Sequence, residues 1–170
     1  MQDSLRQHRC CQVICLGTPR LHEKLNRTAL QRRLEGSAAE VSGTETRSLL
    51  LDLDIRFRQF NYPGDYARFN MFTRHFFSSS EKQACWERLK LAQGLVIDPP
   101  FGAPLAALAN TLNWLRALIP SIKVFLYFPY FSRVRFVRLK GFTGVVVQLR
   151  VAVNGGVFSS RLLFRSTSHG

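Results

Sequence analysis

The feature that most constrains the fold is a recurring pattern of short apolar runs, each of which ends abruptly and is followed by apolar residues at helical spacing. Residues 12–16 form the first run, which ends at Gly17, and leucines then recur at helical spacing to about Leu34. Residues 95–97 form a later run, and Pro104 opens another helical stretch. Strands that alternate with helices in this way predict a mainly parallel sheet with helices on both faces.

The middle of the chain continues this alternation. Residues 48–54 predict a second strand that is apolar almost to its acidic end, as expected for a strand that is covered on both faces. A connector rich in arginine and aromatic residues follows, and a short strand is expected within 69–77. Ser78, with Glu81 three residues later, has the spacing of a capping box and predicts a helix that runs to about Ala92.

The C-terminal part of the sequence predicts a fourth strand and then a less regular segment. The strand is expected over 123–130, where aromatic residues are frequent. Asn154-Gly155-Gly156 lies between two apolar runs, which is a hairpin pattern. We therefore expect an α/β domain over 1–131 and, over 132–170, a basic segment that forms either a hairpin or a disordered tail.

The charge of the chain is high and lies mostly near its two ends. Lys and Arg number 24 against 11 Asp and Glu, which gives a formal net charge of +13. Residues 131–170 contain seven basic side chains and no acidic ones, and residues 1–33 contain seven basic and two acidic ones. A surface this basic favours a polyanionic partner, with nucleic acid first and an acidic membrane second, although solvated flanks are an equally ordinary explanation.

Several classes of protein do not fit the sequence. The N-terminus lacks an apolar core of the kind found in signal peptides, so we do not expect secretion. No run reaches the roughly 18 uncharged apolar residues of a membrane span. Cys10, Cys11, Cys15 and Cys85 lack paired C-x-x-C spacing, and the four histidines lack ligand spacing, so buried thiols are expected and a metal site is not.

Polar or turn residues follow four of the predicted strands, at 17–20, 52–54, 98–101 and 129–130. In open α/β sheets, ligands bind beyond the carboxyl ends of the strands. Because the carboxyl ends of parallel strands lie at one edge of the sheet, we expect these four segments to contribute to a single site.

The segment Asp98-Pro99-Pro100-Phe101 is the most informative of the four. It would place a carboxylate at the edge of the sheet, followed by two prolines that stiffen the turn and donate no hydrogen bond, and then an aromatic ring. An acceptor carboxylate, an acceptor carbonyl and a stacking ring suit a flat heterocycle with an exocyclic amine, such as adenine. The ordinary alternative is a strand-to-helix turn with a buried Phe101.

Two of the remaining three segments are weaker evidence. In Gly17-Thr18-Pro19-Arg20, Thr18 is a favourable N-cap residue and the helix that follows directs its positive dipole end at the edge of the sheet, where a carboxylate can bind. An ordinary strand-to-helix turn is the alternative. Asp54, or Asp52, could hold a ribose diol by analogy with nucleotide-binding folds, although a single acidic strand end is usually only solvated.

These residues carry a family resemblance. Asp98-Pro99-Pro100-Phe101 resembles the D-P-P-[FWY] signature of adenine-N6 methyltransferases that use S-adenosyl-L-methionine. Further segments resemble, in the same order, the zinc-finger CCHC-domain large-subunit ribosomal RNA adenine-N6 methyltransferases: residues 15–23, 49–57, 69–72, 75–77 and 128–131. The resemblance covers about residues 10–131. The zinc modules of that family have no counterpart in this sequence, and residues 132–170 depart from its last strands, which leaves open whether the sheet is complete at that edge.

The resemblance implies a Rossmann-like class I methyltransferase fold that uses S-adenosyl-L-methionine and acts on ribosomal RNA. Residues at the methionine end of the cofactor would be Gly17, Thr18, Pro19 and Arg20. Residues near its sugar and adenosine would be Asp54, Arg56, Asn70, Met71 and Phe72, with Asp98 also at the cofactor. The target adenine would be held by Asp98, Pro99, Pro100 and Phe101. The resemblance also implies a location in the nucleus, nucleolus and cytoplasm.

Two other functions remain open at this point. One is a non-catalytic RNA-binding fragment or splice product of such an enzyme, and the other is a membrane-surface or protein-interaction module that uses the basic, aromatic C-terminal segment. In the RNA-binding functions, the expected phosphate contacts are Arg133, Arg135, Arg138 and Lys140. Binding of S-adenosyl-L-methionine would distinguish the enzyme from the other two.

Overall fold

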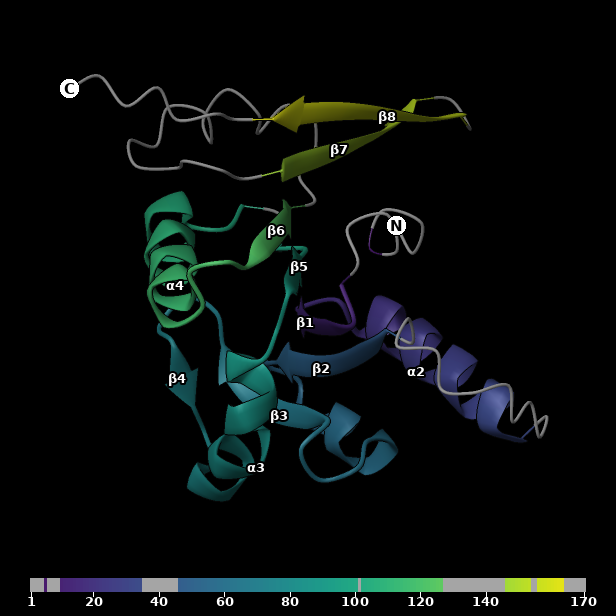
Figure 1. The fold of residues 1–170 in the computed structure, drawn as a ribbon. Coiled ribbons are helices and arrows are strands. Elements are labelled where there is room, and N and C mark those ends of the chain that lie inside the picture. The colour runs from purple at the N-terminus through teal and green to yellow at the C-terminus, as the bar shows by residue number, and fades with distance from the viewer. Residues whose placement is uncertain are drawn as a thin grey trace.

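The computed structural model describes Leu5 and residues 10–34, 46–100, 102–126, 146–153 and 156–163. The strands of this part of the chain form one sheet in the order β4-β3-β2-β1-β5-β6-β7-β8 (Figure 1). The strands are β1 (Gln12–Leu16), β2 (Arg47–Asp52), β3 (Tyr66–Asn70), β4 (His75–Phe76), β5 (Gly94–Ile97), β6 (Lys123–Leu126), β7 (Val146–Val153) and β8 (Gly156–Leu163). The helices are α2 (Pro19–Leu34), α3 (Ser79–Lys90), α4 (Leu105–Leu118) and the 3-10 helix η1 (Ile55–Phe60).

The sheet is mainly parallel, as the sequence predicts. Strands β3, β2, β1, β5, β6 and β7 are parallel to their neighbours, whereas β4 is antiparallel to β3 and β8 is antiparallel to β7. The register of β1 places Cys15 beside Leu50 of β2 and Val96 of β5. The carboxyl ends of the central strands therefore lie at one edge, which we call the C-terminal edge of the sheet.

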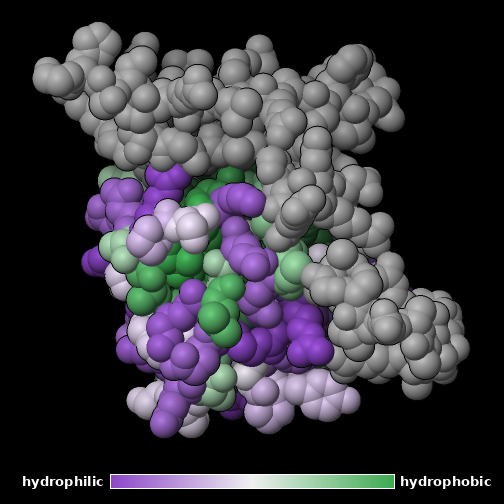
Figure 2. All heavy atoms as spheres, viewed as in Figure 1, coloured by the Kyte–Doolittle hydropathy of each residue, from purple (hydrophilic) through white to green (hydrophobic). Residues whose placement is uncertain are grey.

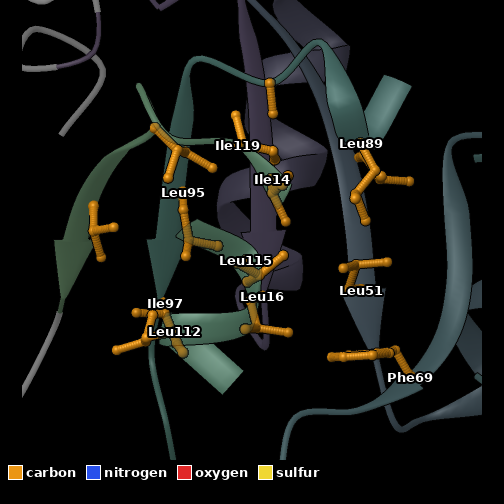
Figure 3. Close-up of a cluster of buried hydrophobic side chains, with 14 of the residues drawn as sticks. Ile14, Leu16, Leu51, Phe69, Leu89, Leu95, Ile97, Leu112, Leu115 and Ile119 are labelled. Carbon is orange, nitrogen blue, oxygen red and sulfur yellow. The ribbon is translucent and has the colours of Figure 1, made fainter. Parts of the chain in front are cut away.

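Helices cover both faces of the sheet, and the alternation of side chains along each strand explains how. Ile14 and Leu16 of β1 pack with α3 and α4 in the larger core cluster (Figure 3). Val13 and Cys15 point to the opposite face, where Leu25 of α2 packs. Because both faces are covered, the central strands consist almost entirely of apolar residues. In the space-filling view, hydrophobic side chains show in the middle of the described face and hydrophilic ones surround them (Figure 2).

Two of the predicted strands have different limits in the structure. The strand expected over 48–54 ends at Asp52, because the Asp54 side chain caps η1 by accepting a hydrogen bond from the Arg56 amide. The single strand expected within 69–77 is a pair, β3 and β4, joined by a tight turn. Asn70 stabilises this turn, since its Oδ1 accepts hydrogen bonds from the amides of Phe72 (2.9 Å) and Thr73 (3.3 Å).

Of the two hydrogen bonds expected in the predicted capping box before α3, one is confirmed. Ser78 Oγ accepts from the Glu81 amide at 3.2 Å and caps the helix. The Glu81 carboxylate instead accepts from the Arg68 amide (2.9 Å) and from Arg58 Nε (2.7 Å). Glu81 therefore joins α3 to β3 and η1, which the local spacing did not predict.

The last two strands extend the sheet beyond β6. β7 pairs with β6 in parallel and with β8 in antiparallel register, from Val146 opposite Leu163 to Val153 opposite Gly156. This is the arrangement of the predicted hairpin, and the boundary proposed between 131 and 132 stays a prediction. Within the described ranges, no helix is long and apolar enough to cross a membrane.

Candidate functional site

Backbone hydrogen bonds bring the ends of three strands together at the C-terminal edge of the sheet. The Gly17 amide donates to the Leu51 carbonyl at 3.0 Å, which joins the end of β1 to β2. The Asp98 amide donates to the Leu16 carbonyl at 3.3 Å, which joins the segment after β5 to β1. The turn after β1, the acidic end of β2 and the segment after β5 are therefore neighbours, as expected for parallel strands.

Gly17 is the residue at which the predicted segments meet. Its φ of +68° is a conformation that favours glycine. A Cβ atom at this position would lie 2.8 Å from Met71 Cε and 3.2 Å from the Asp98 carbonyl oxygen. The structure thus places the turn after β1, the turn after β3 and the segment after β5 around one glycine, and a side chain there would fill the space between them.

Asp98 follows β5 and its side chain reaches solvent. Nearby protein atoms nevertheless desolvate the carboxyl group in part, and this raises its pKa above the usual value for aspartate. Within the described residues, its carboxylate has no hydrogen-bond or ion-pair partner, so both oxygens can accept from a ligand. Pro99 is buried, and the Pro100 carbonyl accepts from the Ala103 amide at 3.0 Å, so that carbonyl already has a partner. Phe101 lies outside the described residues.

Thr18 and Pro19 occupy the positions expected of them at the start of α2, with one difference. The His22 amide donates to the Thr18 carbonyl at 3.1 Å, so Thr18 is the N-cap residue by position. Its hydroxyl does not cap the helix, which corrects the prediction. Thr18 Oγ1 is buried and has no nitrogen or oxygen partner among the described residues, although the Cys15 thiol lies beside it. Arg20 is exposed.

Asp52, at the end of β2, and Asp54, two residues later, are in different surroundings. Arg56 binds both Asp54 oxygens, with Nε at 2.9 and 3.0 Å and Nη2 at 2.6 Å, and these hydrogen bonds lower the pKa of Asp54 to about 2. Asp52 is the last residue of β2 and is half-buried, and this burial raises its pKa. Asp52 Oδ1 accepts from the Asp54 amide at 2.9 Å. Asp54 and Arg56 therefore neutralise each other, whereas Asp52 accepts hydrogen bonds from the backbone amides of Asp54 and Leu53.

Thr111 holds the turn that carries Met71, and the sequence did not identify it as a functional residue. Its hydroxyl donates to the Met71 carbonyl at 2.5 Å, and the residue is fully buried on the apolar face of α4. Phe69 and Trp114 stack with their ring centroids 6.1 Å apart, which makes a second contact between β3 and α4. A lone hydroxyl on the otherwise apolar face of α4 was the pattern that could have drawn attention to Thr111.

We predict that Thr111→Val lowers the free energy of unfolding by about 1–2 kcal/mol, because the Met71 carbonyl loses its hydrogen bond. Chemical denaturation would measure this loss. The matched control is Thr111→Ser, which keeps the hydroxyl and should recover most of the lost stability. If Thr111→Val were as stable as the unchanged chain, the hydrogen bond would not be what holds the turn.

His22 is a buried residue in a polar network rather than a ligand at the edge of the sheet. Its Nε2 lies 2.6 Å from Asn61 Oδ1 and its Nδ1 lies 2.9 Å from Ser48 Oγ. Nε2 also lies 3.1 Å from Asn26 Nδ2, and Ser48 Oγ donates to Asn26 Oδ1 at 3.2 Å, so Asn26 completes the network. Burial, more than any other factor, lowers the pKa of His22; the hydrogen bond to Asn61 opposes this, and the nearby charge of Arg88 adds to it.

This lowered pKa predicts that the protein loses stability in mild acid. The unfolded chain takes up a proton at His22 near its ordinary pKa of about 6.5, whereas the folded chain resists it until a lower pH. The free energy of unfolding should therefore fall as the pH is lowered through about 6.5, by at most about 1.4 kcal/mol per pH unit from this residue. Denaturation at several pH values would measure the slope, and the same slope in His22→Gln would exclude His22 as its source.

Some of the predicted site residues cannot be placed. The predicted phosphate contacts Arg133, Arg135, Arg138 and Lys140 lie outside the described residues, as do Pro129 and Tyr130. Asn70, Met71 and Phe72 are placed in the turn after β3, with Met71 facing Gly17 and the Asn70 side chain used within the turn. The part of the chain that is described holds no group of three or more His, Cys, Asp or Glu residues that could bind a metal ion.

Comparison with known proteins agrees with this geometry. A family model described as "Probable N6-adenine methyltransferase" matches residues 1–140. Curated proteins named rRNA N(6)-adenosine-methyltransferase ZCCHC4 are similar to 72% of the chain: that of Mus musculus is 38% identical over 138 residues, that of Xenopus tropicalis 35% over 136, and that of Homo sapiens 33% over 138. The chain spans about a quarter of the length of these relatives (25%, 26% and 25%).

Proposed function

The chain belongs to the family described as "Probable N6-adenine methyltransferase", and on this premise we propose that it methylates N6 of an adenosine in ribosomal RNA, with S-adenosyl-L-methionine as the methyl donor. The observation that carries the proposal is the meeting of Gly17, Met71 and the Asp98 segment at one edge of the sheet. The printed names of the relatives support the choice of ribosomal RNA and N6 of adenosine.

The residues at this edge suit the proposed methyl donor. Gly17 leaves a space that a single Cβ would fill, and Thr18 offers a buried hydroxyl without a nitrogen or oxygen partner among the described residues. The start of α2 provides backbone amides and the positive end of a helix dipole for the carboxylate of the donor. When bound, S-adenosyl-L-methionine supplies an electrophilic methyl group. Gly17, Thr18, Pro19 and Arg20 would hold its amino-acid end.

For the sugar of the donor, the structure favours Asp52 over Asp54. Both Asp54 oxygens already accept from Arg56, and a new ligand would have to displace that guanidinium. Asp52 ends β2 at the edge of the sheet and accepts from backbone amides, so a ribose hydroxyl could bind it without displacing a guanidinium. Arg56 then keeps Asp54 in place as the cap of η1, and Asn70 shapes the turn that presents Met71 and Phe72 to the adenosine part.

Asp98 and Pro99 would prepare the adenine. An exocyclic amine is a poor nucleophile, because its lone pair is delocalised into the ring. The Asp98 carboxylate and the Pro99 carbonyl would each accept a hydrogen bond from one N6–H, which draws the nitrogen toward a tetrahedral geometry and localises the lone pair. Among the described residues, no backbone amide donates to the Pro99 carbonyl. Positioning of this kind lowers a barrier by several kcal/mol, with roughly 7–11 kcal/mol as the limit for ideal orientation.

The target base has to be reached outside its stack. An unpaired adenosine in a loop is easier to extrude than one in a helix, so single-stranded or looped ribosomal RNA is the expected substrate. Phe101 would stack on the adenine, and Arg133, Arg135, Arg138 and Lys140 would bind phosphates. These two roles stay predictions from the sequence.

A methyl-transfer assay tests the proposed function. The purified chain would be incubated with radiolabelled S-adenosyl-L-methionine and ribosomal RNA, and the modified nucleoside would be identified by mass spectrometry as N6-methyladenosine. Calorimetry would measure binding of the donor separately. Binding without transfer would favour the non-catalytic RNA-binding alternative, and the absence of both would exclude the proposed activity for this chain.

A further inference from the structure

We propose that η1 and the two residues after it form a second RNA-contacting surface, on which unpaired bases that flank the target adenosine stack. We call it the η1 surface and define it by Arg58, Phe60 and Tyr62 together with the cavity beside them. The inference rests on the proposed function in one respect, namely that the partner is RNA.

The exposure of two large aromatic rings is the first observation. Phe60 is 75% exposed and Tyr62 is 79% exposed. Phe57, which precedes both rings, packs against the core. Asn61 lies between the rings, and its side chain donates to the Phe57 carbonyl at 2.7 Å and contacts His22. Because these anchors fix the backbone, Phe60 and Tyr62 cannot turn inward without breaking buried contacts. The segment therefore holds both rings toward solvent.

A cavity beside the Tyr62 ring is the second observation. Its volume is about 430 Å³, and it lies between the segment after η1 and the start of α3. Its lining includes Arg58, Asn61, Tyr62, Tyr66, Ser78 and Ser80. Ligand pockets usually measure about 300–1,000 Å³. The cavity therefore has room for a nucleobase, with aromatic walls for stacking, and its polar groups include hydroxyls and the paired Arg58 guanidinium and Glu81 carboxylate.

The third observation is the direction of the arginine side chains. Arg58 pairs with Glu81, and Arg58 is 55% exposed whereas Glu81 is 15% exposed. In the Asp54–Arg56 pair, the guanidinium is again the more exposed partner. The acidic groups are thus covered and the guanidinium planes face solvent, where they can bind phosphate or stack on bases. Exposed aromatics next to outward guanidinium groups are typical of single-strand recognition.

The location connects this surface with the site at the C-terminal edge of the sheet. Asp54, which caps η1, lies two residues beyond the end of β2. η1 lies beside β3, on the side of the sheet away from β6 (Figure 1). Asn61, which follows η1, contacts the His22 side chain that also contacts Ser48 near the start of β2, so η1 runs back from the C-terminal edge. An RNA strand bound at that edge would follow η1 in this direction to reach the two rings.

The test compares Phe60→Ala/Tyr62→Ala with the unchanged chain and with Leu91→Ala as a matched control. Leu91 is also an exposed apolar residue (70%), but it follows α3 and lies outside the η1 surface. Fluorescence anisotropy would measure affinity for an unstructured RNA oligonucleotide containing one adenosine and for an RNA duplex. We expect the double variant to lose single-strand affinity by roughly 5- to 150-fold for each lost stack, which corresponds to about 1–3 kcal/mol per base. Leu91→Ala should match the unchanged chain.

Two further measurements separate this inference from the proposed function. Binding of S-adenosyl-L-methionine should be the same in the double variant and in the unchanged chain, which also shows that the variant folds. Ultraviolet crosslinking of the unchanged chain to the oligonucleotide should place crosslinks at Phe60 or Tyr62. If RNA binding depends on these rings but no methyl transfer is found, the surface stands and the proposed activity fails.

The inference would be overturned by unchanged single-strand affinity in the double variant, by an equal loss for the duplex, or by crosslinks confined to other segments. It would also be overturned if the unchanged chain bound no RNA. In that case the exposed aromatic and arginine side chains would point to a protein partner, since interfaces between proteins are enriched in the same residue types.

Discussion

Replacing Asp98 with alanine is expected to lower the rate of methyl transfer by at least about 100-fold and to leave the affinity for S-adenosyl-L-methionine within a few-fold of its original value. The carboxylate has no partner among the described residues, so its loss removes no known contact within the protein. It removes the acceptor that would orient the adenine amine, and a misplacement of about 1 Å is enough for an effect of about 100-fold.

The measurement is the initial rate with ribosomal RNA, together with calorimetry of donor binding and a thermal unfolding curve. Stability should change by no more than about 0.5 kcal/mol, as for most surface substitutions. Asp98→Asn is the matched control, because it keeps one acceptor oxygen without the charge and should fall between Asp98→Ala and the original chain. Near-normal turnover by Asp98→Ala would remove Asp98 from the proposed catalytic role.

The raised pKa of Asp98 also predicts how the rate of methyl transfer depends on pH. Partial burial raises the pKa above the ordinary value of about 3.9, so the carboxylate takes up a proton at a higher pH than an exposed aspartate would. As the pH is lowered, the rate of methyl transfer should therefore begin to fall above a pH of about 3.9, and this fall should be absent in Asp98→Asn.

Replacing Gly17 with alanine is expected to weaken binding of S-adenosyl-L-methionine by at least about tenfold. The new Cβ would lie 2.8 Å from Met71 Cε and 3.2 Å from the Asp98 carbonyl oxygen, so it would occupy the space at which the three segments meet. Met71 can shift its flexible end, whereas the Asp98 carbonyl oxygen belongs to the backbone and yields less easily. The backbone conformation adds about 1–2 kcal/mol of strain for a non-glycine residue. A tenfold loss corresponds to about 1.4 kcal/mol of binding free energy.

Gly102→Ala is the control for that strain. Gly102 has a φ of +79°, similar to Gly17, but among the described residues no atom beyond its chain neighbours lies within 4 Å of the position of its Cβ. Both variants should lose stability in thermal unfolding, Gly17→Ala more so because of its close contacts, and only Gly17→Ala should lose donor affinity in calorimetry. Equal losses of affinity would show that backbone strain causes the effect, and Gly17 would then have no specific role in donor binding.

The existence and type of most elements could be predicted from local sequence, and their ends less well. The runs that became β1 and β5 are continuous apolar stretches, and Ser78 capped α3 as its spacing indicated. The predicted end of β2 was wrong by two residues. Asp54 and Arg56 form a local cap and an ion pair, which compete with strand pairing. Thr18 has the residue type of an N-cap, yet its hydroxyl is directed elsewhere.

For the candidate site, too, some features could be predicted from the sequence and others could not. The D-P-P-F segment and the glycine turn were recognised from residue type and from their place at strand ends, since the geometry of a parallel sheet brings such ends to one edge. Asp52 and Asp54 were equivalent in the sequence. They differ in the structure, because Arg56 reaches only one of them.

Local residue pattern was therefore sufficient for the order of strands and helices, the mainly parallel sheet and the identity of the segments at its edge, because periodicity and capping act over a few residues. It was not sufficient for contacts between residues far apart in the chain. Met71 lies against Gly17, Thr111 holds the Met71 turn, and His22 joins Ser48 and Asn61. These contacts depend on how the layers pack, and packing is a property of the whole folded chain that no short stretch of sequence encodes.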